Sequence, residues 1–281
     1  MKNFRIDCRG KILRISEKPM IMGILNVTPD SFSDGAAFLD PAAAVAHAHL
    51  MADDGADIID VGGESTRPGS LPVPPDEQIR RICPVIWTLA RRLDIPISVD
   101  TTSAAVASAA LEAGADLIND VSALRFDPEM AHLAARSGAP VILMHMLGDP
   151  RSMQSNPTYT DVVREVKQFL SERINFALTA GINRSQIIID PGIGFGKTIE
   201  HNLLLLKHLA DFCDLDVPIL IGPSRKSFIG KILNLEDPAQ RIFGTAAALA
   251  AAVLAGAHIF RVHDVKEMSQ VACLAAAIRK A

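Results

Sequence analysis

One local pattern recurs along the chain and constrains the fold more than any other feature. In five places a glycine stands where a helix should stop, an unbroken aliphatic run follows, and polar residues end the run. The five copies are "DGADIID" (54–60), "AGADLIND" (113–120), "SGAPVILMH" (137–145), "AGINRSQIIID" (180–190) and "AGAHIFRVHD" (255–264). The glycine fits a left-handed helix cap, and the unbroken apolar run fits a parallel strand buried on both faces. Each copy therefore predicts a helix followed by a buried parallel strand.

Three further aliphatic runs lack the preceding glycine, and they bring the number of expected strands to eight: residues 20–28, 96–101 and 218–225. Helical patterns lie between the runs, the clearest from Val162 to Ala177 with an apolar residue at a period of 3.6. Strands alternating with helices in this way predict a single (β/α)8 TIM barrel, one domain spanning residues 1–281. We expect the first 19 residues to form a β-hairpin that plugs the barrel bottom.

A doubly wound open sheet is the alternative architecture. That fold usually carries a glycine fingerprint after its first strand, whereas the first run here ends in Asn26. The glycine-rich segment "DPGIGFGKT" (190–198) does not supply one either. A Walker loop needs a glycine where Pro191 stands, and the glycines at every second position do not fit G-x-G-x-x-G.

Composition narrows the partners and the compartment. The net charge of -4 gives no basic footprint for nucleic acid, and the four cysteines are widely spaced, as is usual in a reducing cytosol. The only candidate membrane span, residues 242–260, is alanine-rich and reads better as a packed helix followed by a strand. The N-terminus lacks the apolar core of a signal peptide. We therefore expect a cytoplasmic protein without a nucleic-acid or membrane partner.

Polar residues end the expected strands, and active sites of TIM barrels form at those carboxyl ends. The strand-end residues are Asn26, Asp60 to Arg67, Asp100, Asn119 with Asp120, His145, Asp190, Ser224 to Lys226, and Arg261 with His263. A strand-end aspartate is often only a helix N-cap, and Asp60 and Asp120 are the leading candidates for that role. Polar ends on all eight strands exceed the needs of capping, so the pattern predicts a concave polar pocket.

The residue types indicate what such a pocket would bind. Arg261 and His263 are two apart on a strand and point the same way, so with Arg67 they would form an anion site. Asn26 is a candidate single protein ligand for Mg²⁺, which keeps waters and takes further oxygens from substrate phosphates.

A second group of residues would read a flat ligand rich in N–H donors. Its members are the acceptors Asp100, Asn119 and Asp190, with Lys226 as a compact donor beside them. The pocket is thus expected to combine an anion-binding site with a site that forms hydrogen bonds to a flat heterocycle.

Seven stretches together resemble the dihydropteroate synthases of folate biosynthesis. They are "NVTPDSFSDG" (26–35), "GGESTRPG" (62–69), "SVDT" (98–101), "LINDVS" (117–122), "DPGIGFGK" (190–197), "PSRKSFIG" (223–230) and "RVHDV" (261–265). The resemblance covers nearly the whole chain. It implies a homodimeric TIM-barrel transferase that joins 6-hydroxymethyl-7,8-dihydropterin diphosphate to p-aminobenzoate with the help of Mg²⁺. The alanine-rich segment 238–255 is a candidate dimer surface.

The resemblance also implies roles for individual residues. Pterin contacts fall on Asp100, Asn119, Asp190 and Lys226, with Met144 and Arg261 against the ring. The diphosphate and metal positions fall on Asn26, Thr66, Arg261 and His263. The p-aminobenzoate pocket falls on Phe32, Arg67, Pro68, Phe195 and Ser227. Residues expected to act in catalysis are Asp100, Lys226, Arg67 and Asp34, the last by closing the site.

Two other functions are compatible with a pterin-reading barrel. One is a corrinoid-dependent methyltransferase acting on a methyl-folate, and the other is a non-catalytic pterin-binding barrel. Neither needs the "ESTRPG" segment with Arg67, which is intact here. One departure from the family pattern is Ala36, where a second glycine is more usual, and it would stiffen the tip of the first loop.

Overall fold

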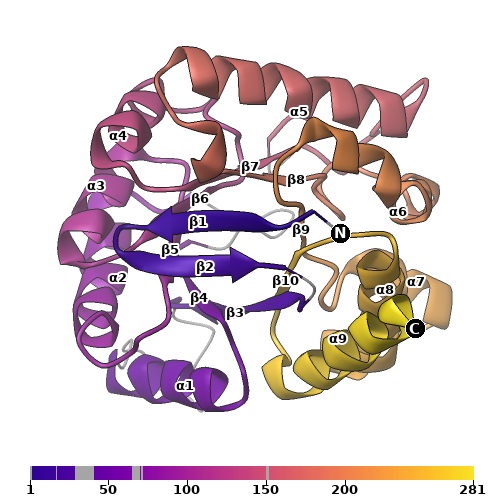
Figure 1. Cartoon of the computed structure of the whole chain (residues 1–281), viewed down its shortest axis with the longest axis horizontal. Helices are drawn as coiled ribbons and strands as arrows, with labels where there is room; N and C mark the ends of the chain where they lie inside the picture. Colours follow the sequence, from indigo (N-terminus) through magenta and orange to yellow (C-terminus); the bar gives the residue numbers. More distant parts are fainter. Residues whose placement is uncertain (1, 17, 29–40, 65–69, 71, 150–151) are drawn as a thin grey trace.

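A parallel eight-stranded sheet forms the centre of the computed structural model, which describes residues 2–16, 18–28, 41–64, 70, 72–149 and 152–281 (Figure 1). The strands are β3 (Met20–Asn26), β4 (Ile58–Gly62), β5 (Ile97–Asp100), β6 (Leu117–Asp120), β7 (Val141–Met144), β8 (Ile187–Asp190), β9 (Leu220–Ile221) and β10 (Ile259–Val262). They pair in the order β8-β7-β6-β5-β4-β3-β10-β9. A parallel bridge between Ile189 and Ile219 joins the two ends of this order, so the predicted barrel is confirmed.

Helices surround the sheet and alternate with its strands (Figure 1). They are α1 (Pro41–Asp53), α2 (Pro75–Leu89), α3 (Ala104–Ala113), α4 (Glu129–Ser137), α5 (Val162–Thr179), α6 (Ile199–Lys207), α7 (Ser227–Leu233), α8 (Ile242–Leu254) and α9 (Val265–Lys280). Short 3₁₀ turns add η1 (Arg184–Gln186), η2 (Leu209–Leu215) and η3 (Pro238–Arg241). The apolar face predicted for residues 162–177 is buried in α5. Within the described part of the chain, no helix is both long and apolar enough to cross a membrane.

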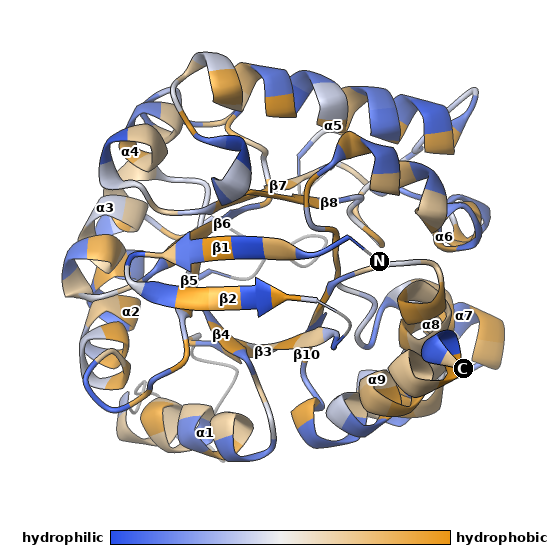
Figure 2. Ribbon diagram, viewed as in Figure 1, coloured by the Kyte–Doolittle hydropathy of each residue, from blue (hydrophilic) through white to orange (hydrophobic). Residues whose placement is uncertain are grey.

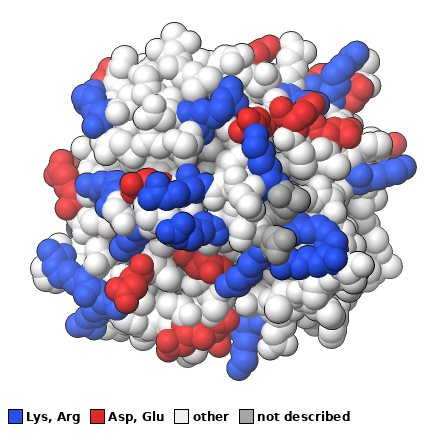
Figure 3. Space-filling view, viewed as in Figure 1, with Lys and Arg blue, Asp and Glu red and all other residues white. Residues whose placement is uncertain are grey.

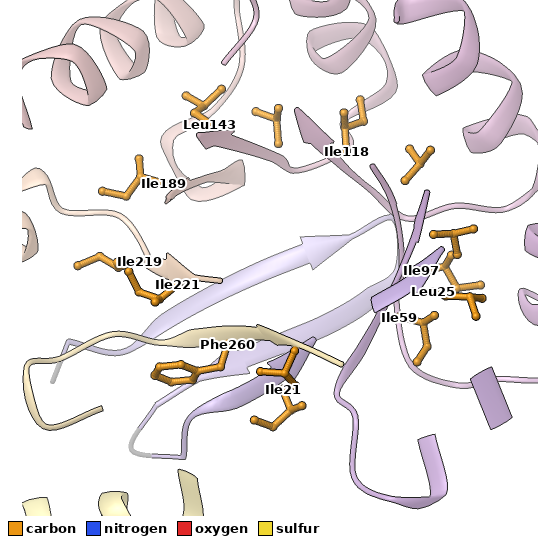
Figure 4. Close-up of a cluster of buried hydrophobic side chains, with 14 of the residues drawn as sticks. Ile21, Leu25, Ile59, Ile97, Ile118, Leu143, Ile189, Ile219, Ile221 and Phe260 are labelled. Atoms are coloured by element: carbon orange, nitrogen blue, oxygen red, sulfur yellow. The ribbon is translucent and has the colours of Figure 1, made fainter. Parts of the chain in front are cut away.

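Side chains that point outward from the strands form the main core, between the barrel and the helices. Figure 4 shows this layer, with Ile21, Ile59, Ile118 and Ile189 among its members. Because side chains alternate between the two faces of a strand, the neighbours of these residues point into the barrel. This alternation decides which polar residues reach the interior.

The N-terminal hairpin closes the amino end of the barrel. It consists of β1 (Phe4–Cys8) and β2 (Lys11–Ile15), lies across the barrel centre in Figure 1, and alternates hydrophobic with hydrophilic residues in Figure 2. Its buried side chains pack on inward residues near the beginnings of the strands: Ile6, Cys8, Leu13 and Ile15 contact a cluster that includes Met22, Ile58, Leu117, Ile142, Ile188 and Ile259. The hairpin therefore plugs the barrel bottom, as predicted.

The outer side of the hairpin is cationic. Arg5 and Arg14 on its two strands are exposed, and Figure 3 shows Lys and Arg side chains gathered over this part of the molecule. This patch lies at the amino end of the barrel, whereas the polar strand ends lie at the opposite end. It is therefore separate from the predicted anion site.

Candidate active site

A cavity of about 380 Å³ opens at the carboxyl ends of the strands. Residues predicted from the sequence that line it are Asn26, Asn119, Met144, Asp190, Phe195, Lys226, Ser227, Arg261 and His263. Asp100 joins them through an ion pair with Arg261, Oδ2 to Nη2, at 2.7 Å. The predicted residues Phe32, Asp34, Thr66, Arg67 and Pro68, and also Ala36, lie outside the described residues.

Strand alternation brings these residues from distant parts of the chain to one mouth. Asn26, Asn119 and Asp190 each stand on the inward face of their strand, near its carboxyl end. Arg261 and His263, two apart on β10 and its continuation, both line the cavity as their spacing predicts. The barrel thus supplies a rigid frame for a set of polar groups that the sequence keeps far apart.

Asp120 and His145 are strand-end residues that do not line the cavity. Asp120 accepts hydrogen bonds from the backbone N–H groups of Ser122 and Leu124, at 2.8 Å each. It therefore holds the turn after β6, not the start of a helix as predicted. His145 packs edge-on against Phe169 of α5. Both side chains follow an inward residue and so point the other way.

Asp60 corrects the sequence interpretation more strongly. It was expected to cap a helix, but its side chain is fully buried inside the barrel, 0% exposed. Its Oδ2 accepts from Arg261 Nε at 2.6 Å and from Asn119 Nδ2 at 3.0 Å. Asp60 stands on the inward face of β4, two positions before Gly62, and inward residues of a barrel do not reach helix N-termini.

Arg261 is held between two carboxylates. Its Nε binds Asp60 and its Nη2 binds Asp100, so the guanidinium cannot turn without breaking a charged hydrogen bond. The pKa of Asp100 is raised to about 7, mainly by burial; the charge of Arg261 opposes this rise and the charge of Asp60 adds to it. The carboxyl of Asp100 therefore gains or loses its proton close to neutral pH.

Asp190 and Lys226 form the centre of the polar cavity wall. Asp190 Oδ1 accepts from the N–H of Gly192 at 2.7 Å. Burial raises the pKa of Asp190 to about 6, opposed by that hydrogen bond and by the charge of Lys226. Burial likewise lowers the pKa of Lys226 to about 8, opposed by the charge of Asp190. Between these values the pair offers an anionic acceptor and a cationic donor.

The glycines of "DPGIGFGK" shape the wall beside Asp190. Gly192 has φ +72°, and a Cβ there would stand 1.8 Å from the carbonyl oxygen of His145. At Gly194 a Cβ would come within 2.8 Å of the Lys226 side chain. These positions need glycine because backbone and lysine approach too closely for any side chain. The segment therefore packs against Lys226 and leaves Phe195 at the mouth.

The buried side chain of Lys197 holds the segment 190–197 in place through two contacts. Lys197 Nζ lies 2.9 Å from His145 Nδ1 and donates to the carbonyl oxygen of Phe195 at 3.0 Å. Burial lowers the pKa of Lys197 to about 7, and burial together with the charge of Lys197 lowers that of His145 to about 2. His145 is therefore neutral and accepts from the lysine. The sequence interpretation gave no role to this pair.

An apolar group completes the cavity. Val121, Met144, Met153 and Phe195 form a small buried cluster at the mouth, together with Met146. Lys226 Nζ stands 4.0 Å from the centre of the Phe195 ring, a cation–π arrangement. A flat ring could pack against this side while its edge meets Asn119 and Asp190. Val121 and Met153 were missed because only polar strand ends were considered.

His263 is oriented by a serine. Ser224 Oγ accepts from the backbone N–H of His263 at 3.2 Å and lies 2.9 Å from His263 Nδ1. Ser224 thus holds both the backbone and the ring of His263, which lines the cavity.

The oxygen of Asn26 was predicted to bind a metal. In the described part of the chain, no group of three or more His, Cys, Asp or Glu residues could hold an ion. Asn26 lines the cavity, and its Oδ1 lies 3.6 Å from where a Cβ of Gly62 would stand. Because residue 62 is a glycine, no side chain from this position of β4 lies over the amide oxygen. A single hard oxygen fits Mg²⁺ held mainly by water and phosphate oxygens.

Comparison with known proteins decides the family. Residues 22–263 match the family model described as pterin binding enzyme. A dihydropteroate synthase from Synechocystis sp. is 49% identical over 262 residues, which cover 93% of this chain and 91% of that protein. The chain belongs to the dihydropteroate synthases.

Solved dihydropteroate synthases share the whole fold. The enzyme of Xanthomonas albilineans with 4-aminobenzoic acid has a TM-score of 0.93 and 46% identity, with 100% of both chains covered. A dihydropteroate synthase from the same organism in complex with 7,8-dihydropteroate has a TM-score of 0.89 and 45% identity, with 99% of both chains covered. These likenesses confirm the family that the motifs predicted. All three of these relatives are dihydropteroate synthases.

Proposed function

We propose that this dihydropteroate synthase condenses 6-hydroxymethyl-7,8-dihydropterin diphosphate with p-aminobenzoate to give 7,8-dihydropteroate and diphosphate. The observation that supports this most is the composition of the cavity at the carboxyl end of the barrel. It combines acceptors at Asn119 and Asp190, a cationic donor at Lys226 and an apolar side at Met144 and Phe195. This combination suits a flat heterocycle with several N–H groups.

The pterin ring would lie with its polar edge toward Asp190 and Asn119. The free oxygen of Asp190 accepts ring N–H groups, because Oδ1 is already fixed by Gly192. Lys226 donates to an acceptor atom of the ring and stands over Phe195. Asp100, tied to Arg261, places a second carboxylate close to the ring. Two carboxylates facing the ring favour positive charge on it as the diphosphate departs.

The diphosphate would be bound at the same mouth by the imidazole of His263 and the guanidinium of Arg261. Asn26 Oδ1 would hold Mg²⁺, which supplies charge compensation for the diphosphate oxygens when bound. Departure of diphosphate breaks the C–O bond of the pterin methylene, and the oxygen keeps the electron pair. These groups all stabilise the negative charge that develops on the leaving group.

The second substrate would approach past Phe195 and Ser227, which stand at the mouth. An arylamine is neutral near pH 7, so its nitrogen attacks without a strong base. A C–N bond forms at the methylene, and the amine loses one proton to solvent. We propose that this pocket is completed by Phe32, Arg67 and Pro68. Asp34 would close it, and Thr66 would belong to the diphosphate site.

Diphosphate release tests this function directly. Purified protein is mixed with the dihydropterin diphosphate, p-aminobenzoate and Mg²⁺, and diphosphate is measured over time. We expect release that requires both organic substrates, with 7,8-dihydropteroate formed in equal amount. Methyl transfer to a cobalamin, or tight pterin binding with no turnover, would overturn the proposal.

The pKa values of Asp190 and Lys226 predict a bell-shaped pH profile for pterin affinity. Below about pH 6 Asp190 gains a proton and ceases to accept two N–H groups, and above about pH 8 Lys226 loses its proton. We therefore expect affinity to be greatest between these values. Calorimetry with a pterin that stays neutral over this range measures it. A flat profile would show that the pair does not contact the ligand.

We also place the protein in the cytoplasm and expect it to be a homodimer. The described cysteines are free thiols, which suits a reducing compartment. Large apolar side chains are exposed on α7, α8 and α9: Ile232, Leu233, Phe243, Leu254, Leu274 and Ile278. Phe243 is 84% exposed. Such a gathering of apolar side chains marks an interaction surface.

The dimer is tested by one substitution on this surface. Phe243→Asp should convert the dimer to a monomer in sedimentation velocity. The reason is that burial of an unpaired charge in an apolar interface is unfavourable in free energy and would weaken association. Trp87→Asp on α2, which is also exposed, is the matched control and should leave the dimer intact. A wild-type monomer at micromolar concentration, or a dimeric Phe243→Asp protein, would contradict the expected surface.

A further inference from the structure

Asp60 contacts two cavity residues without facing the cavity itself. Its Oδ2 accepts from both Asn119 Nδ2 and Arg261 Nε, and its side chain is completely buried. Asn119 and Arg261 both line the cavity. Any effect of Asp60 on a ligand must therefore pass through these two neighbours.

The contact with Asn119 fixes which end of the amide the ligand meets. An ionised carboxylate has only acceptors, so the amide of Asn119 must turn its NH₂ group toward Asp60. Its Oδ1 is then the atom left for the ligand. Without Asp60 the amide could rotate by half a turn and present a donor instead. Asp60 thus determines that a ligand atom at this place is an N–H donor.

The contact with Arg261 fixes the second cavity residue. Asp60 takes Nε and Asp100 takes Nη2, so the plane of the guanidinium is set by two carboxylates. Both hydrogen bonds are charge-assisted, and such bonds are strong and directional. Loss of Asp60 would leave Arg261 fixed by Asp100 alone.

The hydrogen bonds of Asp60 within the protein are confined to one of its oxygens. Oδ2 accepts from Asn119 and Arg261, whereas among the described residues Oδ1 is a buried atom without a partner, as is the hydroxyl of Ser98 on the neighbouring strand. The contacts that hold this carboxylate are therefore those that orient two residues of the site.

We propose that Asp60 is a positioning residue for pterin recognition, which orients Asn119 as an acceptor and fixes the plane of Arg261. This rests on the proposed function. It assigns to β4 a role in ligand specificity, although no atom of Asp60 touches the ligand.

The test uses Asp60→Asn, which keeps the shape but adds a donor that can face Asn119. The probe is 6-hydroxymethyl-7,8-dihydropterin, titrated calorimetrically into the full chain. We expect its affinity to fall by about 10- to 100-fold, since displacement of a positioned group costs on this order. The KM for p-aminobenzoate should change by less than about twofold, because distant sites act independently. If Asp60 had only a structural role, its substitution would not weaken pterin binding while leaving the KM for p-aminobenzoate unchanged.

A swap of the two residues provides the rescue. In the double variant Asp60→Asn with Asn119→Asp, the new amide at position 60 donates to a carboxylate at 119. That carboxylate still presents an oxygen to the cavity, so pterin affinity should recover to within about threefold of wild type. This variant also carries the test should Asp60→Asn alone fail to fold.

Asp116→Asn is the control for the loss of a buried charge. Asp116 is a buried carboxylate paired with Lys11 at 3.1 Å, near the amino end of the barrel. We expect it to lower stability without changing pterin affinity. Unchanged pterin affinity in a folded Asp60→Asn protein, or no recovery in the swap, would overturn the role of Asp60. Absence of pterin binding by the wild type would instead overturn the proposed function.

Discussion

Substitution of Lys226 by alanine is expected to weaken dihydropterin binding by about 100-fold or more. Lys226 is the cationic donor of the cavity, and its charge is balanced by Asp190 and Asp100. Truncation of one member of a buried charge pair costs about 2–5 kcal/mol, and each 1.4 kcal/mol is tenfold in affinity. The loss should appear equally in calorimetric affinity and in kcat/KM for the pterin substrate.

Lys231→Ala is the matched control for this result. Lys231 lies on α7, the helix that begins directly after Lys226, but its side chain is exposed. Its removal should leave pterin affinity within about twofold, as is usual for surface substitutions. If the two lysine variants bound pterin equally well, the ligand would not lie beside Lys226.

Arg261→Met should have the largest effect on the whole molecule. It leaves the carboxylates of Asp60 and Asp100 without their cation, although both are buried. Breaking a buried ion pair in this way costs about 3–5 kcal/mol of unfolding free energy. Urea unfolding measures that loss, and turnover should fall below detection because the diphosphate loses a donor.

The sign of the pH dependence makes this prediction specific. Without Arg261 the pKa of Asp100, already raised to about 7, rises further above its unfolded value. The folded variant then binds more protons than the unfolded chain, so its stability increases as pH falls. The loss of unfolding free energy in Arg261→Met, relative to wild type, should therefore be smaller at about pH 5 than at about pH 8.

A surface ion pair provides the comparison for Arg261. Lys167 and Asp214 are also 2.7 Å apart, but Asp214 is largely exposed. Lys167→Met should cost no more than about 1 kcal/mol, because water screens exposed pairs. Equal losses of unfolding free energy in Arg261→Met and Lys167→Met would contradict the buried ion pairs of Arg261. A loss for Arg261→Met that grows toward low pH would contradict them as well.

The strands were predictable because parallel strands buried on both faces need unbroken apolar runs. The weakest case is the run at 218–225, where only Leu220–Ile221 form a strand. Pro218 and Pro223 flank that pair, and proline cannot donate to a ladder. The run therefore looks like a full strand in the sequence, but only Leu220 and Ile221 pair regularly in the sheet.

Within the candidate site, predictions succeeded where a polar residue stands on the inward face of a strand. Asp190 and Asn119 are examples. Asp60 and Asp120 look alike in sequence, since each stands in a short strand that begins with two aliphatic residues, yet one points inward and the other outward. Counting alternate positions from buried inward residues such as Ile58 would have separated them.

The Lys197–His145 pair could not be inferred in the same way. His145 is one position beyond the inward Met144, and Lys197 comes from a glycine turn whose path is not periodic. Only the folded backbone shows that the two side chains meet behind Phe195. Contacts made between irregular segments leave no spacing signal in a sequence.

The decisive measurement is a crystal structure of the protein with 7,8-dihydropteroate bound. We expect the pterin ring to lie in the 380 Å³ cavity, with its N–H edge on Asp190 and on Asn119 Oδ1 and with Lys226 beside it. A ligand bound at the hairpin end of the barrel, or one that meets the NH₂ group of Asn119, would contradict this expectation.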